Sequence, residues 1–481
     1  MRLAVVLGTI GELVRLFSAA FVAPVVVGLI YGELWSALHF VVSGVITFGV
    51  GSLLARLRQG TPTFYRPEAM AVVAGTWLAI CGFSAQPFMM VGLSPVDAAF
   101  ESMSGLTTTG ATILSDFSLY DQSFYFWRSF IQWVGGVGVI ALFVVVLPRI
   151  GIAGRQLFFA ESSSAPSEAV SPQIRLAAGR LWLLYIALTL ACTAGLMATG
   201  MNLYDSLLHA FTALAAGGFS PHPLSVMGYA NPAAEWVLIL FMFLGGASFP
   251  LLLKALLSGP MPLFRDAEFR LYTAITLLCG LGIAVLLSGP LPDGLSIRTG
   301  LFQVVSIIST TGFASVDFQL WADPLKALLL IPMVVGGCAG SAGGGAKVIR
   351  HLLVAKHMSR ELLQALHPQA ILPIRYKGEA VSEQVMRSVV AMVTLYIGIT
   401  FVAGGVLVML GSDPVTAFSG SLACIGNIGP GFNVVGPMGS FGPLSDMSKV
   451  VLTAEMWIGR LEVITVVALL HPDVWRDTRL R

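Results

Sequence analysis

The chain has 481 residues, of which only 11% are charged and 56% are hydrophobic, and its mean hydropathy is +0.84. Because water-soluble proteins carry about 25% charged residues, this composition excludes a soluble globular protein. The net charge of +2 also excludes a strongly charged disordered chain and a nucleic-acid-binding protein. The composition therefore predicts a multi-pass membrane protein, in which the 52 glycines are more than plain helices need.

Apolar runs of about 20 residues, the length of a membrane-spanning helix, recur along the whole chain. They are continuous rather than alternating, which favours helices over strands. We therefore expect an all-α integral membrane protein with ten membrane spans. The runs lie near residues 14–32, 35–54, 69–92, 127–148, 180–200, 235–256, 270–289, 325–348, 386–410 and 449–470.

Most of the 27 Lys and Arg residues fall in one set of connecting segments. The positive-inside rule places those segments, and with them both termini, in the cytoplasm. The outer loops are assigned few basic residues, namely Arg128, Arg298, Lys326 and Lys449, and many acidic ones. An acidic mouth would concentrate cations, although solvated loop charges alone also account for it. The outer acidic residues are Asp97, Glu101, Asp116, Asp121, Asp205, Asp293, Asp317, Asp323, Asp413 and Asp446.

Four similar segments lie roughly 100 residues apart, and each precedes a further apolar run. A glycine is common to all of them, and we take Gly110, Gly218, Gly312 and Gly426 as equivalents. An Asp stands at the same distance before this glycine in three segments, while the third segment has Thr299 there. The segments are ESMSGLTTTGATIL (101–114), HAFTALAAGGFSPH (209–222), VVSIISTTGFASVD (304–317) and SGSLACIGNIGPGF (419–432).

Asp97, Asp205 and Asp413 are predicted to be the N-caps of short helices that run toward the glycines. A helix of about ten residues is roughly 15 Å long, which is half the thickness of a bilayer. Its negative C-terminal end would point at the glycine. Four such half-helices aimed at one axis would form a site that favours cations.

After each glycine the chain must return to the surface as extended backbone, which membranes tolerate only where it lines a cavity or is buried in protein. Glycine permits dihedral angles that turn carbonyl oxygens toward an axis, where they can replace the hydration shell of potassium. Close helix packing is the alternative use of such glycines, but fourfold recurrence favours a filter. The predicted ion-binding residues are Thr108, Thr109, Gly110, Ala216, Gly217, Gly218, Thr310, Thr311, Gly312, Ile425, Gly426 and Asn427.

The predicted span at 325–348 is interrupted by six glycines between Gly336 and Gly345. Each glycine costs up to about 1 kcal/mol relative to alanine in a helix, so unwound backbone should line the cavity here. A nucleotide-cradling loop is the rival interpretation, but no strand precedes this segment and no GK[ST] follows it.

Arg460 lies within the last predicted span, where a buried charge usually marks a functional position. The alternative is a structural ion pair, for which Glu455 and Glu462 are the nearby carboxylates in sequence. Neither carboxylate stands three or four residues from Arg460, so helical spacing does not favour either pairing.

The four segments, together with GGCAGSAGGGAKVIR (336–350) and MWIGRLEVIT (456–465), resemble the Trk/Ktr/HKT superfamily of potassium transporters. The closest resemblance is to the bacterial TrkH/TrkG group, which shares the two extra N-terminal spans. It covers essentially the whole chain and implies potassium uptake across the bacterial cytoplasmic (inner) membrane. It also implies that the glycine-rich loop and the arginine gate the pore. The implied gate residues are Gly336, Gly337, Gly340, Ser341, Gly343, Gly344, Gly345, Lys347 and Arg460.

The resemblance further implies a homodimer with one pore in each protomer, and a cytosolic TrkA-like regulatory subunit that binds nucleotides. K⁺ would be the transported ion, and no cofactor is expected in this chain. In plant HKT relatives a serine at the first filter glycine accompanies sodium preference, so Gly110 argues for potassium. The fourth segment departs from the Thr-Gly pattern with Ile425-Gly426-Asn427, which suggests lower symmetry.

Two alternatives remain open. Within the same superfamily, the chain could be a sodium-permeable or other monovalent-cation transporter. Outside it, a solute carrier or a membrane-bound enzyme could be built from repeats, but carriers usually show two inverted halves and no catalytic cluster is visible. The expected organisation is two N-terminal spans in 1–66 and four pore repeats in 67–155, 156–262, 263–375 (with the gate loop) and 376–481.

Overall fold

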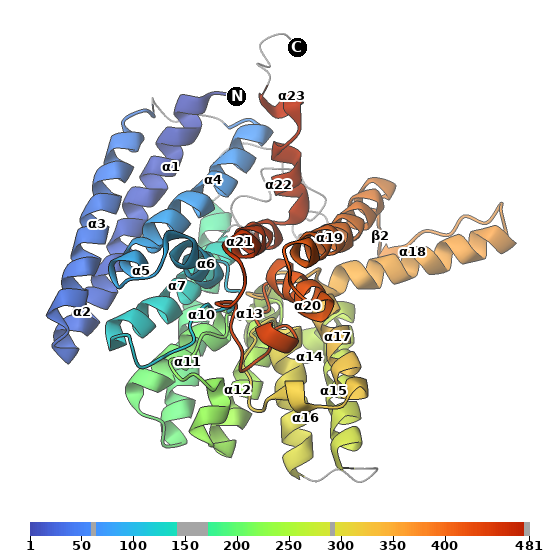
Figure 1. The fold of residues 1–481 in the computed structure, drawn as a ribbon. Coiled ribbons are helices and arrows are strands. Elements are labelled where there is room, and N and C mark those ends of the chain that lie inside the picture. Colours follow the sequence, from blue (N-terminus) through green and yellow to red (C-terminus); the bar gives the residue numbers. More distant parts are fainter. Residues whose placement is uncertain (59–63, 142–171, 289–293, 476–481) are drawn as a thin grey trace.

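The computed structural model describes residues 1–58, 64–141, 172–288 and 294–475. These residues form helices joined by short loops, with one two-stranded hairpin among the described part of the chain. The start of α1 and the short helix α23 (Pro472–Trp475) lie at the same end of the molecule (Figure 1). The predicted boundary between residues 155 and 156 falls outside the described residues.

The N-terminal helices form a hairpin on one flank of the molecule (Figure 1). Close approach of the two backbones depends on glycine: a Cβ at Gly11 would lie 2.4 Å from Leu54 Cβ, and one at Gly51 would lie 2.6 Å from Arg15 N. Small residues allow membrane helices to approach in this way. The helices are α1 (Leu3–Phe17), the 3₁₀ turn η1 (Ser18–Phe21), α2 (Val22–Tyr31) and α3 (Leu34–Ala55).

Six helices among the described residues are long and apolar enough to cross a membrane, or seven if a bent pair counts as one span. The protein is thus an all-helical membrane protein, as its sequence predicts. The spans cover Leu3–Tyr31, Leu34–Ala55, Pro67–Met90 (α4, Arg66–Ser84, with α5, Gln86–Met90), Ala178–Ala198 (in α10, Pro172–Ala198), Ala267–Ser288 (α15) and Glu383–Met409 (α19).

The other predicted spans are broken or only partly described. The run at 127–148 begins inside α7 (Gln122–Ala141) and continues beyond the described residues. The run at 235–256 divides into α12 (Pro232–Gly245) and α13 (Phe249–Ser258), which meet at 102°. The run at 325–348 leaves the helix after α17 (Asp323–Val335), as the glycines predict. The run at 449–470 is interrupted between α21 (Asp446–Arg460) and α22 (Val463–Leu469).

Four short helices converge on the middle of the molecule (Figure 1). Each packs against at least one of the helices that flank it in sequence, such as α7, α15 or α19, so long helices surround the short ones. Each ends in a buried loop. The short helices are α6 (Pro95–Leu106), α11 (Leu203–Leu214), α16 (Gly294–Ile308) and α20 (Pro414–Ile425).

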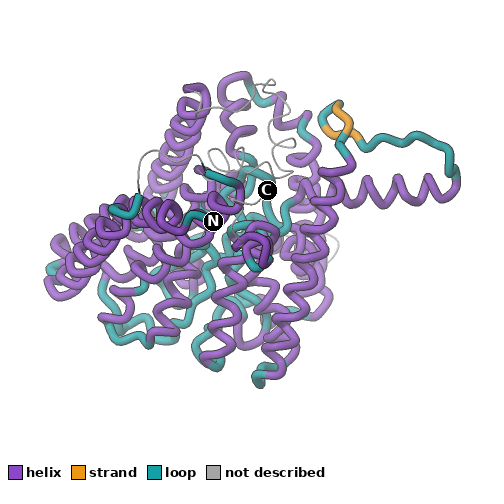
Figure 2. The backbone as a smooth tube through the Cα atoms, turned by 90° about the horizontal axis from the view of Figure 1, so that it is seen from above, coloured by secondary structure: helices purple, strands orange, loops and turns teal. Residues whose placement is uncertain are grey.

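A helical arm projects from the body of the molecule (Figure 2). It consists of α18 (Val348–Leu366) and a return segment that contains the hairpin of β1 (Arg375–Tyr376) and β2 (Glu379–Ala380). Arg360 on α18 forms an ion pair with Glu383 at the start of α19. The short helix α14 (Met261–Arg265) directly precedes α15, and Lys377 of the hairpin forms an ion pair with Asp266 between these two helices.

Candidate selectivity filter and gate

The four loops that follow the short helices share one backbone conformation. In each loop two residues, separated by one, have a left-handed φ. This alternation is rare for residues with side chains, and glycine occupies the second left-handed position every time. The pairs are Thr108 and Gly110 (φ 55° and 81°), Ala216 and Gly218 (56° and 73°), Thr310 and Gly312 (61° and 81°), and Asn427 and Gly429 (51° and 100°).

The glycine at the second left-handed position of each loop lies against the backbone of the next loop, so the four contacts close a ring. A side chain at any of these glycines would collide with a carbonyl oxygen, because real Cβ atoms do not approach within 3.0 Å. The distances from an added Cβ are 2.1 Å from Gly110 to Gly217 O, 1.9 Å from Gly218 to Thr311 O, 2.1 Å from Gly312 to Ile428 O, and 2.7 Å from Gly429 to Thr109 O.

This ring corrects the predicted equivalence of Gly426. Gly426 is the C-cap of α20 with a right-handed φ of −76°, the position that Thr107 and Ala215 occupy after α6 and α11. Gly429 has the φ and the contacts of the other three glycines. The equivalent glycine is therefore Gly429, three residues after the predicted one, and the fourth loop corresponds to 427–429 rather than to the predicted Ile425-Gly426-Asn427.

The predicted N-caps explain why the glycine of the fourth loop was misassigned. Asp413 does cap α20, since its carboxylate accepts a hydrogen bond from Thr416 N at 3.0 Å. However, α6 is capped by Ser94, which accepts from Asp97 N, and α11 by Asn202, which accepts from Asp205 N. Asp97 and Asp205 lie three residues inside their helices, where they still complement the helix dipole. Their prediction as N-caps is wrong.

Buried polar side chains hold these four loops, the candidate filter loops. Gln132 was not singled out from the sequence, whereas Asn427 is one of the predicted ion-binding residues. Gln132 Nε2 donates to Gly217 O at 2.7 Å, and its Oε1 accepts from Phe219 N at 3.1 Å. Asn427 Nδ2 donates to Thr109 Oγ1 at 2.9 Å and to Met456 O at 3.0 Å. These bonds tie neighbouring units together, so the loop conformation depends on several helices at once.

A buried ion pair braces the outer end of the first filter loop. Arg128, on α7, is 1% exposed and donates to Glu101, on α6, at 2.7 Å. Glu101 also accepts from Ile113 N, just after the filter, and the Arg128 guanidinium lies 4.0 Å above the Phe219 ring of the second unit. The prediction that Arg128 and Glu101 are outer-loop charges is therefore wrong.

Replacing Glu101 with glutamine should destabilise the protein strongly, because it leaves the Arg128 charge buried without its partner. Breaking a buried pair in this way costs about 3–5 kcal/mol. Thermal unfolding of the detergent-solubilised protein measures the effect. Glu235→Gln is the matched control, since the Glu235–Arg298 pair joins the short helix α16 to α12 but is partly exposed. Equal losses in both variants would contradict the bracing role of Arg128.

The glycine-rich segment between Val335 and Val348 forms a loop directly beneath the filter. Gly344 N donates to the filter hydroxyl Thr310 Oγ1 at 2.7 Å. An added Cβ at Gly343 would lie 2.6 Å from Ser309 O. The loop also bonds to the bend between α12 and α13, where Ala342 N donates to Gly245 O at 3.2 Å.

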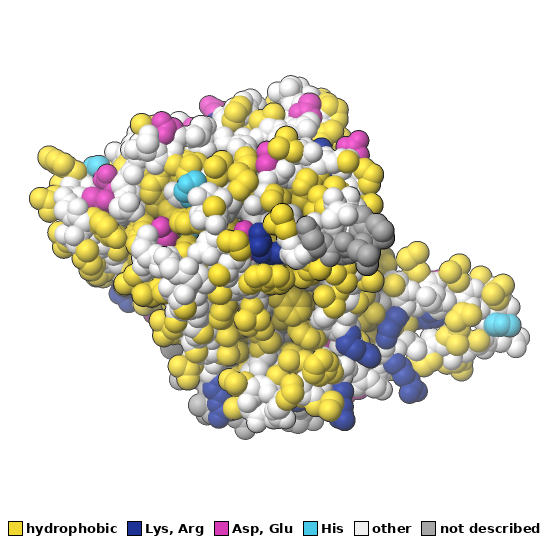
Figure 3. Space-filling view, turned by 90° about the horizontal axis from the view of Figure 1, so that it is seen from below, with side chains coloured by type: hydrophobic (Ala, Val, Ile, Leu, Met, Phe, Trp, Pro, Cys, Tyr) yellow, Lys and Arg dark blue, Asp and Glu magenta, His cyan; other side chains and the backbone are white. Residues whose placement is uncertain are grey.

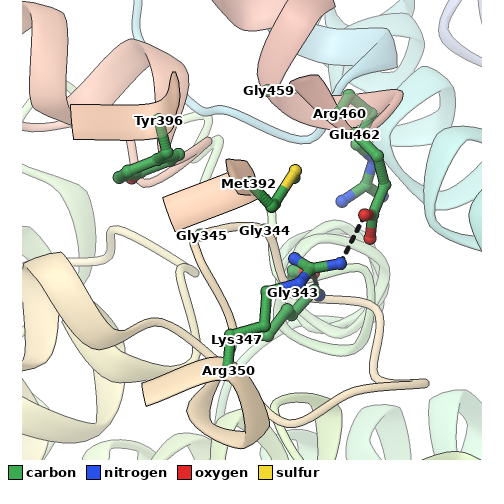
Figure 4. Close-up of a pocket in the computed structure, with 10 residues that line it drawn as sticks. All are labelled: Gly343, Gly344, Gly345, Lys347, Arg350, Met392, Tyr396, Gly459, Arg460 and Glu462. Carbon is green, nitrogen blue, oxygen red and sulfur yellow. Dashed lines mark hydrogen bonds and ion pairs between the residues drawn. The ribbon is translucent and has the colours of Figure 1, made fainter. Parts of the chain in front are cut away.

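Arg460, at the end of α21, faces this loop. Its Nη1 donates to Ala342 O at 2.8 Å and its Nη2 to Gly135 O at 3.5 Å, while Nε has no partner among the described residues. Among the described residues, neither Glu455 nor Glu462 pairs with Arg460. Glu462 instead forms an ion pair with Arg350 (Figure 4), so the alternative of a structural ion pair at Arg460, which helical spacing did not favour, is not found.

A small cavity lies between the loop, Arg460 and α19 (Figure 4). Its volume of about 10 Å³ is room for about one water molecule. The loop residues Gly343, Gly344, Gly345 and Lys347 line it, whereas Gly336, Gly337, Gly340 and Ser341 do not. This cavity therefore leaves little room between the loop and Arg460.

Glu268, on α15, is a further loop contact that the sequence did not reveal. Its Oε1 accepts from Ala339 N at 2.6 Å and from Ile349 N at 3.3 Å, so it links the glycine-rich loop to the start of α18. The residue is 6% exposed. Its position in sequence, at the start of an ordinary span, gives no signal of this role.

The face opposite the termini carries acidic side chains among hydrophobic ones (Figure 3). In the loop that follows residues 108–110, the Ser118 hydroxyl and amide hold the pKa of Asp116 below its ordinary value, so this carboxylate stays ionised. Asp97 is instead paired with Lys449 at 2.7 Å, which joins α6 to α21. Part of the predicted acidic mouth is therefore neutralised.

Known proteins are similar to this chain over nearly its whole length. Residues 38–473 match the TrkH family, described as cation transport protein. The chain is 34% identical over 487 residues to the Trk system potassium uptake protein TrkH of Halomonas elongata, covering 99% of this chain and 100% of the relative. It is 33% identical to the Trk system potassium uptake protein TrkG of Escherichia coli K12, with 97% of each chain covered.

A solved structure matches as well. The crystal structure of the potassium transporter TrkH from Vibrio parahaemolyticus superposes with a TM-score of 0.90 at 32% identity, covering 99% of this chain and 100% of that one. The sequence match and the fold match thus agree over nearly every residue. The chain belongs to the TrkH family of cation transport proteins, which are transporters rather than enzymes.

Proposed function

We propose that the protein takes up K⁺ across the bacterial cytoplasmic membrane through the ring of four filter loops. The observation that carries this proposal is the repeated pair of left-handed residues, each ending in a glycine that lies against the next loop. Such backbone can present carbonyl oxygens to a dehydrated ion. The ion-binding residues are proposed to be 108–110, 216–218, 310–312 and 427–429.

The proposed topology has ten spans: two N-terminal spans and four units, each made of a span, a half-helix, a filter loop and a broken or continuous inner span. The domain limits are those expected from the sequence, and both termini are placed in the cytoplasm. The common end of α1 and α23 supports this placement. The four helix C-termini that meet at the ring favour cations.

We propose that the loop between Val335 and Val348, with Lys347 and Arg460, is the gate. The small cavity and the hydrogen bond from Gly344 to Thr310 support a closed conformation. The names of the relatives refer to a Trk system, which supports the presence of further protein components in the transporter. A TrkA-like nucleotide-binding subunit and a second copy of this chain are the proposed partners.

Glycine at all four ring positions favours K⁺ over Na⁺ as the substrate, whereas transport of another monovalent cation is the alternative. Growth of a potassium-uptake-deficient bacterium on low potassium tests uptake, and ⁴²K⁺ and ²²Na⁺ flux into proteoliposomes tests selectivity. We expect rescue and a preference for K⁺. Equal flux of the two ions would contradict the potassium filter, and absence of rescue with normal protein level would contradict uptake.

A further inference from the structure

Glu455 is a carboxylic acid buried among helices of the fourth unit. It lies on α21, is 2% exposed, and its Oε2 has no hydrogen-bond partner in the described part of the chain. Among the residues that the structure describes, no Lys or Arg forms an ion pair with it. An ionised carboxylate in this position would be an uncompensated charge in a membrane protein interior, which costs several kcal/mol.

The hydrogen bonds of Ser421, on α20, indicate where the proton lies. Ser421 Oγ is 2.7 Å from Glu455 Oε1 and 3.0 Å from Thr400 O on α19. A serine hydroxyl has one hydrogen to donate but two lone pairs to accept with. If Glu455 is ionised, both neighbours are acceptors and compete for that one hydrogen. If Glu455 is protonated, it donates to Ser421, which donates to Thr400, and both bonds are complete.

The surrounding charges favour the same state. Ser421 and Cys424 lie in the last two turns of α20, whose C-terminal end carries negative partial charge. Within the described ranges, the titratable groups that interact with Glu455 are Tyr396 on α19 and Cys424 on α20, and neither supplies a positive charge. On α6, which also packs against α21, Glu101 is paired with Arg128 and Asp97 with Lys449.

We propose that Glu455 is a proton-binding site behind the fourth filter loop, occupied by a proton while the protein conducts. The proposed effect of pH on flux rests on the function proposed above, whereas the protonation of Glu455 can be measured without transport. The site adjoins the filter: the Tyr396 hydroxyl lies 3.0 Å from where a Cβ on Gly426 would stand, and Asn427 donates to Met456 O beside Glu455.

Loss of the proton would leave the Ser421 hydroxyl with one hydrogen for two acceptors, so one of its two bonds would be lost, and it would place a negative charge beside the C-terminal end of α20. This would loosen the contact between α20 and α21 that supports the fourth loop. Flux should therefore fall as pH rises far enough to ionise Glu455, and it should be restored when the pH is lowered.

Infrared spectroscopy of the full-length protein in lipid measures the proton directly, because a protonated carboxylic acid has a C=O stretch that shifts in D₂O. We expect this band in the wild type at neutral pH and its loss in Glu455→Gln. Glu462→Gln is the matched control, since Glu462 is ion-paired with Arg350 and should not contribute to the band. A band that persists unchanged in Glu455→Gln would overturn the proposal.

Potassium flux into proteoliposomes gives the second readout. Glu455→Gln keeps a neutral group that can donate to Ser421, so its flux should lose the alkaline decline of the wild type. An identical pH profile in the two proteins would overturn the coupling to the filter. If the wild type shows the band but no potassium flux at any pH, the proposed function fails while the proton site stands.

Discussion

Alanine at Gly429 should reduce potassium flux at least tenfold and lower selectivity over sodium. Gly429 has a φ of 100°, a conformation that costs an L-residue roughly 1–2 kcal/mol, and its added Cβ would lie 2.7 Å from Thr109 O. The loop can relieve that contact only by moving away from the first unit. The ring of four contacts would then open at one side, and the carbonyl positions on both units would change.

The control for this prediction is Gly426→Ala. Gly426 has an ordinary right-handed φ, and its added Cβ would meet Ile428 Cδ1, Leu422 O and the Tyr396 hydroxyl at 2.8–3.0 Å, of which the side-chain atoms can shift. We expect a smaller effect on flux and selectivity than at Gly429. A larger loss at Gly426, measured as the ⁴²K⁺ to ²²Na⁺ ratio in proteoliposomes, would restore the alignment predicted from sequence.

This difference shows what sequence pattern could and could not predict about the filter. The repeats, the short helices and three of the four glycines follow from composition and spacing. In the fourth unit the Asp is itself the N-cap, whereas in the first two it stands three residues later. Because Asp is favourable at both positions, equal spacing from Asp to glycine aligned the wrong glycine.

The buried polar contacts could not be predicted from the sequence for another reason. Arg128 and Glu101 are adjacent only because α6 and α7 pack side by side, and Arg128 lies at the start of an apolar run, where a surface charge is common. Gln132 and Glu268 contact backbone groups of distant segments. Such contacts depend on tertiary structure, whereas the broken span at Gly336 was predictable because glycine disfavours helix locally.

Replacing Arg460 with glutamine should raise basal potassium flux, measured in proteoliposomes that contain this chain alone. Arg460 places a positive charge next to the cavity beneath the filter. At an effective dielectric constant of about 20, two like unit charges roughly 8 Å apart repel by about 2 kcal/mol, which corresponds to a factor of about 30. Removing the charge should therefore raise flux by about tenfold or more.

Arg460→Lys separates the charge from the hydrogen bonds. Lysine keeps the positive charge but cannot donate to Ala342 O and Gly135 O from one planar group. If repulsion is the barrier, the lysine variant keeps the low flux of the wild type. If the two bonds hold the loop closed, both variants leak to a similar degree, because each releases the backbone around Ala342. Lower basal flux in the glutamine variant, at a normal protein level, would contradict any role of Arg460 as a barrier.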